Sequence, residues 1–459
     1  MDLTFTPDTA CGRPLYEQLY AHLVRQIAAG EIPQNRPLPS RRALSRHLGL
    51  SESTVSAAYE LLRAEGYIRA RERSGYYVTP MEPLPGKKRQ QAPAETKKQE
   101  APARFDFSTS ATDGTLFPYQ VWARLFRQTL YLRPELLARG DAQGDPELRA
   151  ALSDFLEQYR GLRAGPESIV IGAGADYLLS LLLQLLNKNS LVGAEDPGYG
   201  GIYRNCERLS LRALPIPQDE QGMMVPLLAA SGASVCHVTP SHQFPLGLSM
   251  PVGRRAELLR WAGEKKGRLI IEDDYDSEFR HFSRPLPALQ GLDAAGRVAY
   301  IGTFSRSLAP SMRLAYMVLP PQLLESYRES GVKSGETVSR FEQQTLARFI
   351  AEGYYARHLR RAGSAYAARL KGLLKLLGAI PGASFSGEQA GLHFLLTLPS
   401  LSEHELTERA LRAGIRLHGL SEYCRKAKAP PSTLVLGFAG LKDGELGEAV
   451  AALRAAWGL

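Results

Sequence analysis

Residues 300–316 read Tyr300-Ile-Gly-Thr-Phe-Ser-Arg-Ser-Leu-Ala-Pro-Ser-Met-Arg-Leu-Ala-Tyr316. An apolar run ends at the glycine, a polar segment with a proline follows, and a second apolar run continues to Leu319. Similar short runs occur earlier, at Ser168-Ile-Val-Ile-Gly-Ala-Gly174, Ser234-Val-Cys-His-Val-Thr239 and Arg268-Leu-Ile-Ile-Glu272. Short apolar runs that alternate with helical stretches are typical of a mostly parallel sheet covered on both faces. The sequence therefore predicts an α/β domain from residue 105 onward.

The bulk composition indicates a folded chain of more than one domain. Its 459 residues exceed one ordinary core, and its 44% hydrophobic and 22% charged content is that of a globular protein. No apolar run reaches membrane-span length and no secretory signal is visible, so we expect a cytoplasmic protein with no membrane partner. The four cysteines show no Cys-x-x-Cys spacing, which predicts reduced thiols and no metal site.

Residues 81–104 separate two parts of different composition. They are rich in proline, lysine and glutamine and contain almost nothing to bury, which predicts a flexible tether. Residues 1–80 contain ten arginines, no lysines and eight acidic residues, a net charge of +2, whereas the whole chain carries +9. That excess is too small to establish nucleic-acid binding, so the placement of the arginines has to decide.

The first 80 residues have the pattern of three helices and a hairpin. Apolar residues recur every four positions from Leu15 to Ile27, which predicts one helix. Ser40 and Ser51 are suited to be the N-caps of two further helices joined by a short turn. An alternating stretch follows, with a tight turn at Ser74-Gly75, and predicts a two-stranded wing. Together these elements predict a winged helix-turn-helix domain.

This region resembles the DNA-binding domain of the GntR superfamily. The resemblance rests on Leu38-Pro-Ser-Arg-Arg-Ala-Leu-Ser45, Leu48-Gly-Leu-Ser-Glu-Ser-Thr-Val55 and Glu65-Gly-Tyr67. It implies double-stranded operator DNA as a partner. Glu52 stands where many relatives have arginine, and its carboxylate can accept a hydrogen bond from a cytosine amine, so a different operator sequence is expected. The expected DNA-binding residues are Ser40, Arg41, Arg42, Ser51, Glu52, Ser53, Thr54, Arg71, Arg73 and Gly75.

Residues 105–459 resemble the aminotransferase-like half of the MocR/GabR-type regulators. The strongest matches are Glu195-Asp-Pro-Gly-Tyr199, Thr239-Pro-Ser-His-Gln-Phe-Pro-Leu-Gly247 and Glu272-Asp-Asp-Tyr-Asp-Ser-Glu-Phe279, in the family's order and behind a winged helix. The resemblance implies the fold-type-I aminotransferase architecture, with a smaller C-terminal α+β subdomain over roughly residues 330–459. It also implies a homodimer and a site for pyridoxal phosphate (PLP).

The resemblance assigns roles to particular residues. Asp273 would face the pyridine nitrogen, Tyr275 would reach the phenolic oxygen, and Tyr199 would lie over the ring. A phosphate needs backbone amides and a fixed cation, and the turn from a strand into a helix suits this purpose. Arg425 is a candidate for binding an effector carboxylate. The residues expected at the phosphate are Gly174, Ala175, Thr303, Ser305 and Arg313.

Arg306 departs from the family at the position of the Schiff-base lysine. A guanidinium stays protonated and delocalised, so it cannot condense with the cofactor aldehyde. No catalytic residue is therefore assigned, and PLP is expected to bind non-covalently at best. Alternatively, the arginine has converted the pocket into a plain anion site.

Three functions follow from this combination. The first is a transcriptional regulator whose aminotransferase-like domain binds a small-molecule effector, PLP or an amino-acid or other anion, and dimerises. The second is an aminotransferase joined to a DNA anchor, from which substantial activity is not expected because proton transfer loses its usual amine. The third is a ligand-free dimerisation scaffold.

Overall fold

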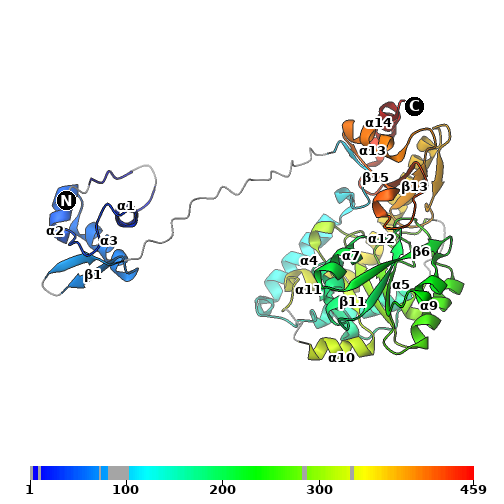
Figure 1. The fold of residues 1–459 in the computed structure, drawn as a ribbon, viewed down its shortest axis with the longest axis horizontal. Coiled ribbons are helices and arrows are strands. Elements are labelled where there is room, and N and C mark those ends of the chain that lie inside the picture. Colours follow the sequence, from blue (N-terminus) through cyan, green and yellow to red (C-terminus); the bar gives the residue numbers. More distant parts are fainter. Residues whose placement is uncertain (1–3, 9–11, 72–73, 81–102, 282–286, 331–334) are drawn as a thin grey trace. The chain divides into compact units, whose positions relative to one another are not determined.

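The computed structural model describes residues 4–8, 12–71, 74–80, 103–281, 287–330 and 335–459. These residues form two compact units, one within residues 1–99 and one within residues 100–459, and each is described by itself (Figure 1). Arg73 and most of the expected tether lie outside the described residues. None of the described helices has the length and hydropathy needed to cross a membrane.

The N-terminal unit is a winged helix-turn-helix, as predicted. The Ser40 and Ser51 hydroxyls cap two of its helices by accepting hydrogen bonds from the amides of Ala43 (3.2 Å) and Thr54 (3.1 Å). Gly49 ends the second helix in a left-handed conformation, at φ 67°. The elements are α1 (Leu15–Ala28), α2 (Arg41–Leu48), α3 (Glu52–Ala64), β1 (Ile68–Arg71) and β2 (Gly75–Val78).

The larger unit is built on an eight-stranded sheet in the order β4-β11-β10-β9-β8-β5-β6-β7. The central neighbours from β10 to β6 run parallel, whereas β11 and β7 pair antiparallel with their neighbours. The predicted, mostly parallel sheet is therefore confirmed. Its strands are β4 (Ile169–Gly172), β5 (Leu191–Asp196), β6 (Arg212–Asp219), β7 (Gly222–Met223), β8 (Val235–Val238), β9 (Leu269–Asp274), β10 (Val298–Thr303) and β11 (Ala315–Val318).

Helices cover both faces of this sheet. Alternate strand residues belong to different cores: Tyr300 packs in the core that includes α5, whereas Ala299 and Ile301 pack in the core that includes α6. This is the two-sided burial that apolar parallel strands require. The helices are α4 (Tyr119–Leu132), α5 (Pro146–Arg160), α6 (Ala175–Gln184), α7 (Gly201–Arg208), α8 (Val225–Ala230), α9 (Val252–Glu264), α10 (Pro321–Glu329), α11 (Arg340–Ala351) and α12 (Tyr354–Leu377).

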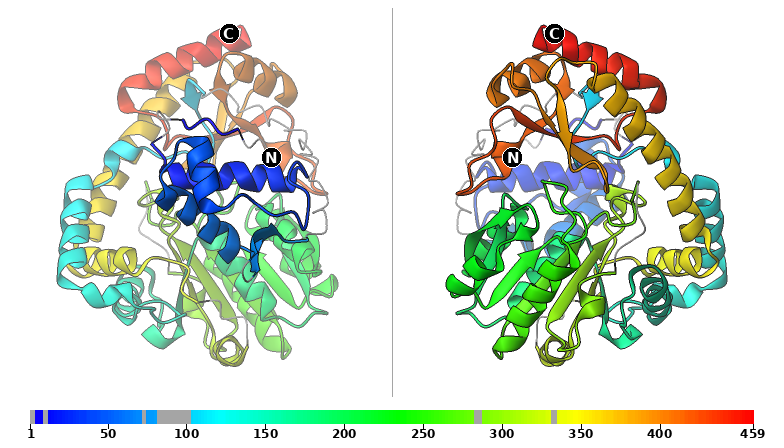
Figure 2. Two further views of the ribbon diagram at one scale, coloured as in Figure 1. Left: turned by 90° about the vertical axis from the view of Figure 1, so that its left-hand side faces the viewer. Right: turned by 90° about the vertical axis from the view of Figure 1, so that its right-hand side faces the viewer.

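A C-terminal subdomain lies at the opposite end of this unit from α10 (Figure 2). Its four-stranded antiparallel sheet has the order β12-β13-β16-β15, and α12 runs from the large subdomain to it. The helix α11 packs on α4 and α5, so this subdomain begins after α11 and not near residue 330. Its elements are β12 (Ser384–Ser386), β13 (His393–Thr397), α13 (Glu403–Arg412), β14 (Ile415–Arg416), β15 (His418–Gly419), β16 (Thr433–Gly437) and α14 (Leu446–Trp457).

The first residues of the larger unit are attached to this C-terminal subdomain. The strand β3 (Phe105–Asp106) pairs in parallel with β14. Flanking hydrogen bonds join the Arg104 amide to the Gly414 carbonyl at 2.7 Å and the Phe107 amide to the Arg416 carbonyl at 2.8 Å. The segment that follows the expected tether is therefore fixed to the C-terminal subdomain.

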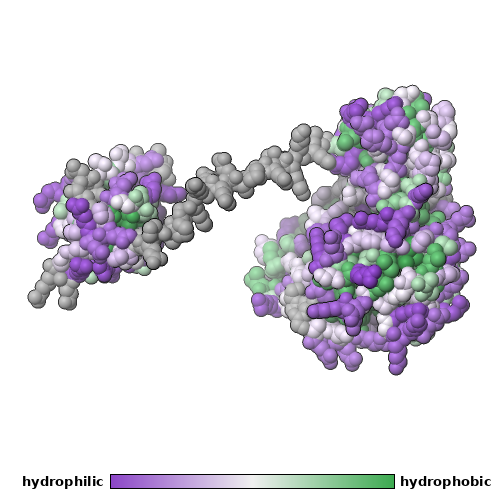
Figure 3. All heavy atoms as spheres, viewed as in Figure 1, coloured by the Kyte–Doolittle hydropathy of each residue, from purple (hydrophilic) through white to green (hydrophobic). Residues whose placement is uncertain are grey.

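Large apolar side chains are exposed around α4. Leu132 is 73% exposed and Leu137, in the 3-10 turn that follows α4, is 80% exposed. Figure 3 shows hydrophobic surface on the side of the larger unit where α4 lies. We call this the α4 patch, and it comprises Leu130, Tyr131, Leu132 and Leu137.

Candidate functional site

A cavity of about 610 Å3 lies at the carboxyl ends of β9 and β10. Ligands bind at this edge of an α/β sheet because the polar residues that follow the strands meet there. The C-terminal subdomain supplies part of the wall through Tyr423 and Arg425. The structure brings together here nearly all the residues expected at the cofactor: Ala175, Tyr199, Asp273, Tyr275, Thr303, Ser305, Arg306 and Arg313.

A buried histidine holds the Asp273 side chain in place. The Nε2 atom of His237 lies 3.3 Å from the Asp273 Oδ2 atom, and the His237 side chain is only 2% exposed. The Tyr199 ring stacks near the same histidine, with 6.3 Å between ring centroids. The Tyr199 hydroxyl donates to Asp176 Oδ1 at 2.7 Å. A carboxylate and a tyrosine ring are thus fixed at the cavity wall. This pair is suited to a ligand whose aromatic ring carries a proton.

The neighbouring Asp274 side chain makes its contacts in the protein interior. Its Oδ2 atom pairs with Arg160 Nη2 at 2.7 Å and accepts a hydrogen bond from the Tyr300 hydroxyl at 2.6 Å. These buried partners anchor the end of β9. Because successive strand residues point to opposite faces, they also direct Asp273 to the cavity.

Tyr275 contacts a buried cluster of His242, Asp276 and His393. Its hydroxyl lies 3.1 Å from His242 Nδ1, which in turn lies 3.0 Å from Asp276 Oδ1. Burial lowers the pKa of His393 to about 3, so this imidazole is neutral. The three cluster residues have the donor types of a metal site. However, His242 and Asp276 bond to each other and His393 Nε2 contacts the Pro245 carbonyl at 3.1 Å. The cluster accordingly orients Tyr275.

At the end of the cavity where a phosphate is expected, the Arg313 side chain packs closely against a glycine. Gly174 precedes α6 with φ 99°, and a Cβ atom on it would lie 2.4 Å from Arg313 Nη2. The Thr303 hydroxyl accepts from the Ser305 amide at 3.1 Å and donates to its hydroxyl at 3.0 Å. A cation, two hydroxyls and the first amides of a helix are thus arranged for an anion.

Replacing Gly174 by alanine is expected to disable this end of the cavity. The added Cβ would displace Arg313, and a side chain at this positive φ costs about 1–3 kcal/mol. Losing a charge-assisted contact weakens the binding of a phosphate ester on the order of 10- to 100-fold. Calorimetric titration with PLP and a thermal melt measure the two effects. Gly253→Ala in α9, where an added Cβ meets nothing within 4 Å, is the matched control. Equal affinities in the two variants would contradict the assignment.

Arg306 lies in the loop after β10 and also lines the cavity. Burial lowers the pKa of its guanidinium below the ordinary value, although Asp276 and Tyr275 act in the opposite direction. No lysine is among the described residues that line this cavity. Arg425 lies at the cavity wall too, but its guanidinium stacks over the Tyr203 ring at 4.8 Å.

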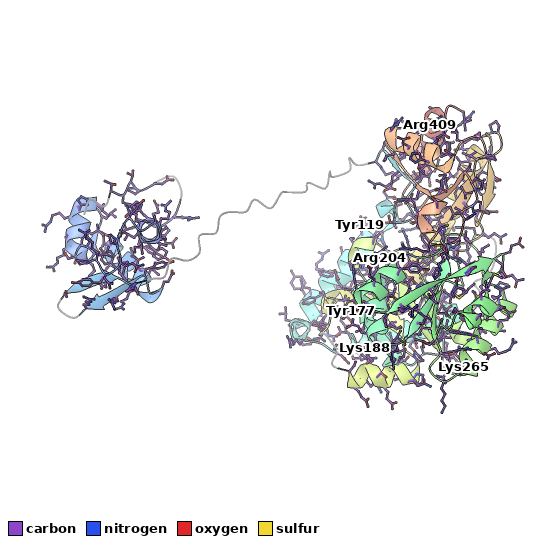
Figure 4. All side chains as sticks on the ribbon, viewed as in Figure 1. Tyr119, Tyr177, Lys188, Arg204, Lys265 and Arg409 are labelled. Atoms are coloured by element: carbon purple, nitrogen blue, oxygen red, sulfur yellow. The ribbon has the colours of Figure 1, made fainter. Side chains whose placement is uncertain are left out.

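The sequence did not single out several residues that line or support the cavity. His237 lay inside an apolar run, where only the alternation of strand residues could have placed it on the side of Asp273. Arg204, labelled in Figure 4, comes from α7, five residues after Tyr199. The spacing of these residues along the chain gave no signal of a shared cavity. The other lining residues without an expected role are Thr109, Ser110, Asp176, Leu179, Gly200, Thr239, Phe244, Pro310, His418, Glu422 and Tyr423.

The expected DNA-binding residues gather at the start of α3 and at α2. The Ser51 hydroxyl lies 2.9 Å from that of Ser53 and 2.7 Å from that of Thr54. Arg42 Nε lies 3.5 Å from Glu52 Oε1, and both side chains are exposed. The hydroxyls thus lie at the N-terminus of α3, the second helix of the helix-turn-helix, and the exposed Arg42 guanidinium lies beside it on α2. In the wing, Arg71 lies over the Tyr77 ring at 4.4 Å.

The comparisons with known proteins match both units. The family of bacterial regulatory proteins, gntR family, matches residues 15–78, and aminotransferase class I and II matches residues 105–453. The HTH-type transcriptional regulator YdeL of Bacillus subtilis is 37% identical, with 100% of each chain covered. The rhizopine catabolism regulatory protein MocR of Rhizobium meliloti is 32% identical over 97% of this chain and 94% of its own. The chain belongs to the MocR-type transcriptional regulators.

The fold of this MocR-type regulator's larger unit is that of the aminotransferases. The kynurenine aminotransferase of Pyrococcus horikoshii superimposes with a TM-score of 0.69 at 24% identity, covering 78% of this chain and 91% of that one. PLP is the cofactor of this fold family. The cavity residues fit its phosphate, ring and ring nitrogen, as the close approach of Arg313 to Gly174 and the Asp273–His237 pair indicate. They do not fit its covalent attachment, because the described lining residues include Arg306 but no lysine.

Proposed function

We propose that this MocR-type regulator binds a small phosphorylated ligand, PLP or a relative of it, without a covalent bond. The observation on which the proposal depends is the close approach of Arg313 to Gly174 at the start of α6, beside a cavity whose described lining residues include Arg313 but no lysine. We assign these two residues to a phosphate cradle. Bound PLP supplies a phosphate, a basic ring nitrogen and a phenolic oxygen for recognition. Arg313 binds the first, Asp273 holds the proton on the second, and Tyr275 contacts the third.

We further propose that the ligand controls DNA binding by a homodimer. A winged helix reads one half-site, so two copies are needed for a two-fold operator, and the separation of the half-sites reports the geometry of the dimer. The α4 patch supports self-association, because soluble monomers rarely expose several large apolar side chains together. A ligand that binds one arrangement of the dimer more tightly shifts the population towards it.

Ligand binding and the absence of covalent attachment can be tested together. We expect calorimetry to show saturable binding of PLP to the full chain. Borohydride treatment followed by mass spectrometry is expected to leave every lysine unmodified. The same ligand should change the affinity for an operator selected by the wild-type protein from random duplexes. PLP fixed to a lysine in the cavity by reduction would refute the non-covalent assignment, and an unchanged operator affinity would refute the regulatory one.

A further inference from the structure

The cavity contains acidic residues that already have partners and a half-buried arginine for which no hydrogen bond or ion pair is found among the described residues. Asp273 is paired with His237 at 3.3 Å, and Asp176 accepts from the Tyr199 hydroxyl at 2.7 Å. Glu422 accepts from His418 Nδ1 at 2.9 Å. Within the described residues, by contrast, the Arg306 side chain makes no ion pair or hydrogen bond.

The acid that interacts most strongly with Arg306 is Asp276, which forms its hydrogen bonds with other groups and no ion pair with Arg306. The Asp276 carboxylate lies 3.0 Å from His242 Nδ1 and accepts a hydrogen bond from the Leu392 amide at 3.1 Å. A desolvated guanidinium without a paired anion is unfavourable, and its burial already lowers the pKa of Arg306. We therefore expect the ligand to supply the anion that pairs with the Arg306 guanidinium.

The position of Arg306 in the loop indicates which part of the ligand carries that anion. Arg313 and the start of α6 form the phosphate end, and Asp273 lies at the ring. Arg306 replaces the amine that would meet the carbon bearing the PLP aldehyde. A planar guanidinium is complementary to a carboxylate, which it binds through two parallel hydrogen bonds, and it gains much less from a neutral carbonyl group.

From this arrangement we infer that the preferred ligand is a phosphorylated pyridine with a carboxylate at the position where PLP carries its aldehyde, formed either from that carbon itself or by an amino acid joined to it through nitrogen. Arg306 pairs with the carboxylate while Arg313 pairs with the phosphate. This inference rests on the proposed function and narrows it to ligands with two acidic ends. Two sources share that chemistry: a ring oxidised to the acid at this carbon, and a ring linked through this carbon to an amino acid.

Ligands that differ only at this carbon provide the test. We would titrate the full chain calorimetrically with pyridoxal 5′-phosphate, pyridoxamine 5′-phosphate, 4-pyridoxic acid 5′-phosphate and the reduced adduct of pyridoxal 5′-phosphate with glycine. A carboxylate ligand should bind on the order of tenfold or more tightly than the aldehyde, and the cationic amine should bind most weakly. Whichever carboxylate ligand binds more tightly identifies the source.

Matched variants separate Arg306 from the general charge of the cavity. Arg306→Gln should abolish the preference for the carboxylate and leave the affinity for the aldehyde within a few-fold. Arg204→Gln removes a guanidinium from the same cavity and should preserve the order of affinities. Thermal melts check that both variants fold.

The outcomes distinguish this inference from the proposed function. If the wild-type protein binds all four ligands equally, or prefers the amine, the inference is wrong and the proposed function stands. If it binds none of them, the proposed function itself fails. The wild-type order of affinities decides the matter even if a variant does not fold.

Discussion

Replacing Arg306 by lysine is expected to turn a protein that cannot attach PLP into one that attaches it stoichiometrically. The variant introduces a primary amine into a cavity that already contains the proposed phosphate cradle and the proposed ring-nitrogen partner. Burial already lowers the pKa of the arginine, and the same environment favours the neutral, nucleophilic form of a lysine amine. A yellow complex with a visible absorbance band should appear on addition of PLP.

The position of the attachment can be verified directly. Borohydride should fix the cofactor at residue 306 in the lysine variant, as seen by peptide mass spectrometry, and Arg306→Gln should remain colourless. A folded lysine variant that stays colourless at saturating PLP would show that the cavity is not a PLP site. A lasting exchange of amino groups between an amino acid and a keto acid by the unsubstituted chain would overturn the non-catalytic interpretation altogether.

Removal of Arg42 is expected to weaken operator binding by roughly 100-fold or more, because both protomers of a dimer lose a contact at once. One base contact is worth about 1–3 kcal/mol, so two such losses amount to about 2–6 kcal/mol. The Arg42 side chain is 83% exposed and lies beside Glu52 at the start of α3. Its loss should therefore leave folding unchanged. Gel shifts at one fixed salt concentration measure the effect, since affinities depend steeply on salt.

The control is an exposed arginine of the next helix, α3. Arg63 lies in the last turn of α3, away from the end that reads a major groove. Arg63→Ala removes the same charge and should weaken binding only slightly. If Arg42→Ala and Arg63→Ala lose equal affinity, only the general positive charge matters and the placement of α3 in a groove is wrong.

Features that depend on neighbouring residues in the chain were predictable from the sequence. The Ser40 and Ser51 caps are local, and each was found where it was expected. The apolar runs named in the sequence form five of the eight strands of the large sheet, namely β4, β8, β9, β10 and β11. The cavity residues were predictable as a set because the resemblance to a family fixed their order along the chain. Their individual roles remain predictions.

Features that depend on packing were not predictable. The strand β6 contains two prolines, a composition that argues against a strand inside a sheet. The apolar stripe of α11 could equally have packed on the C-terminal sheet, and only the three-dimensional structure shows it on α4 and α5. Likewise, the positions of Arg204 and Asp176 along the chain do not predict that both residues line the same cavity.

The pairing of β3 with β14 has a mechanical consequence. At the start of the larger unit, the backbone amide of Arg104 donates a hydrogen bond to the Gly414 carbonyl. Tyr423 and Arg425, which contact the ligand cavity, belong to the same C-terminal subdomain. Any rotation of that subdomain upon a bound ligand would therefore carry with it the point at which the larger unit begins.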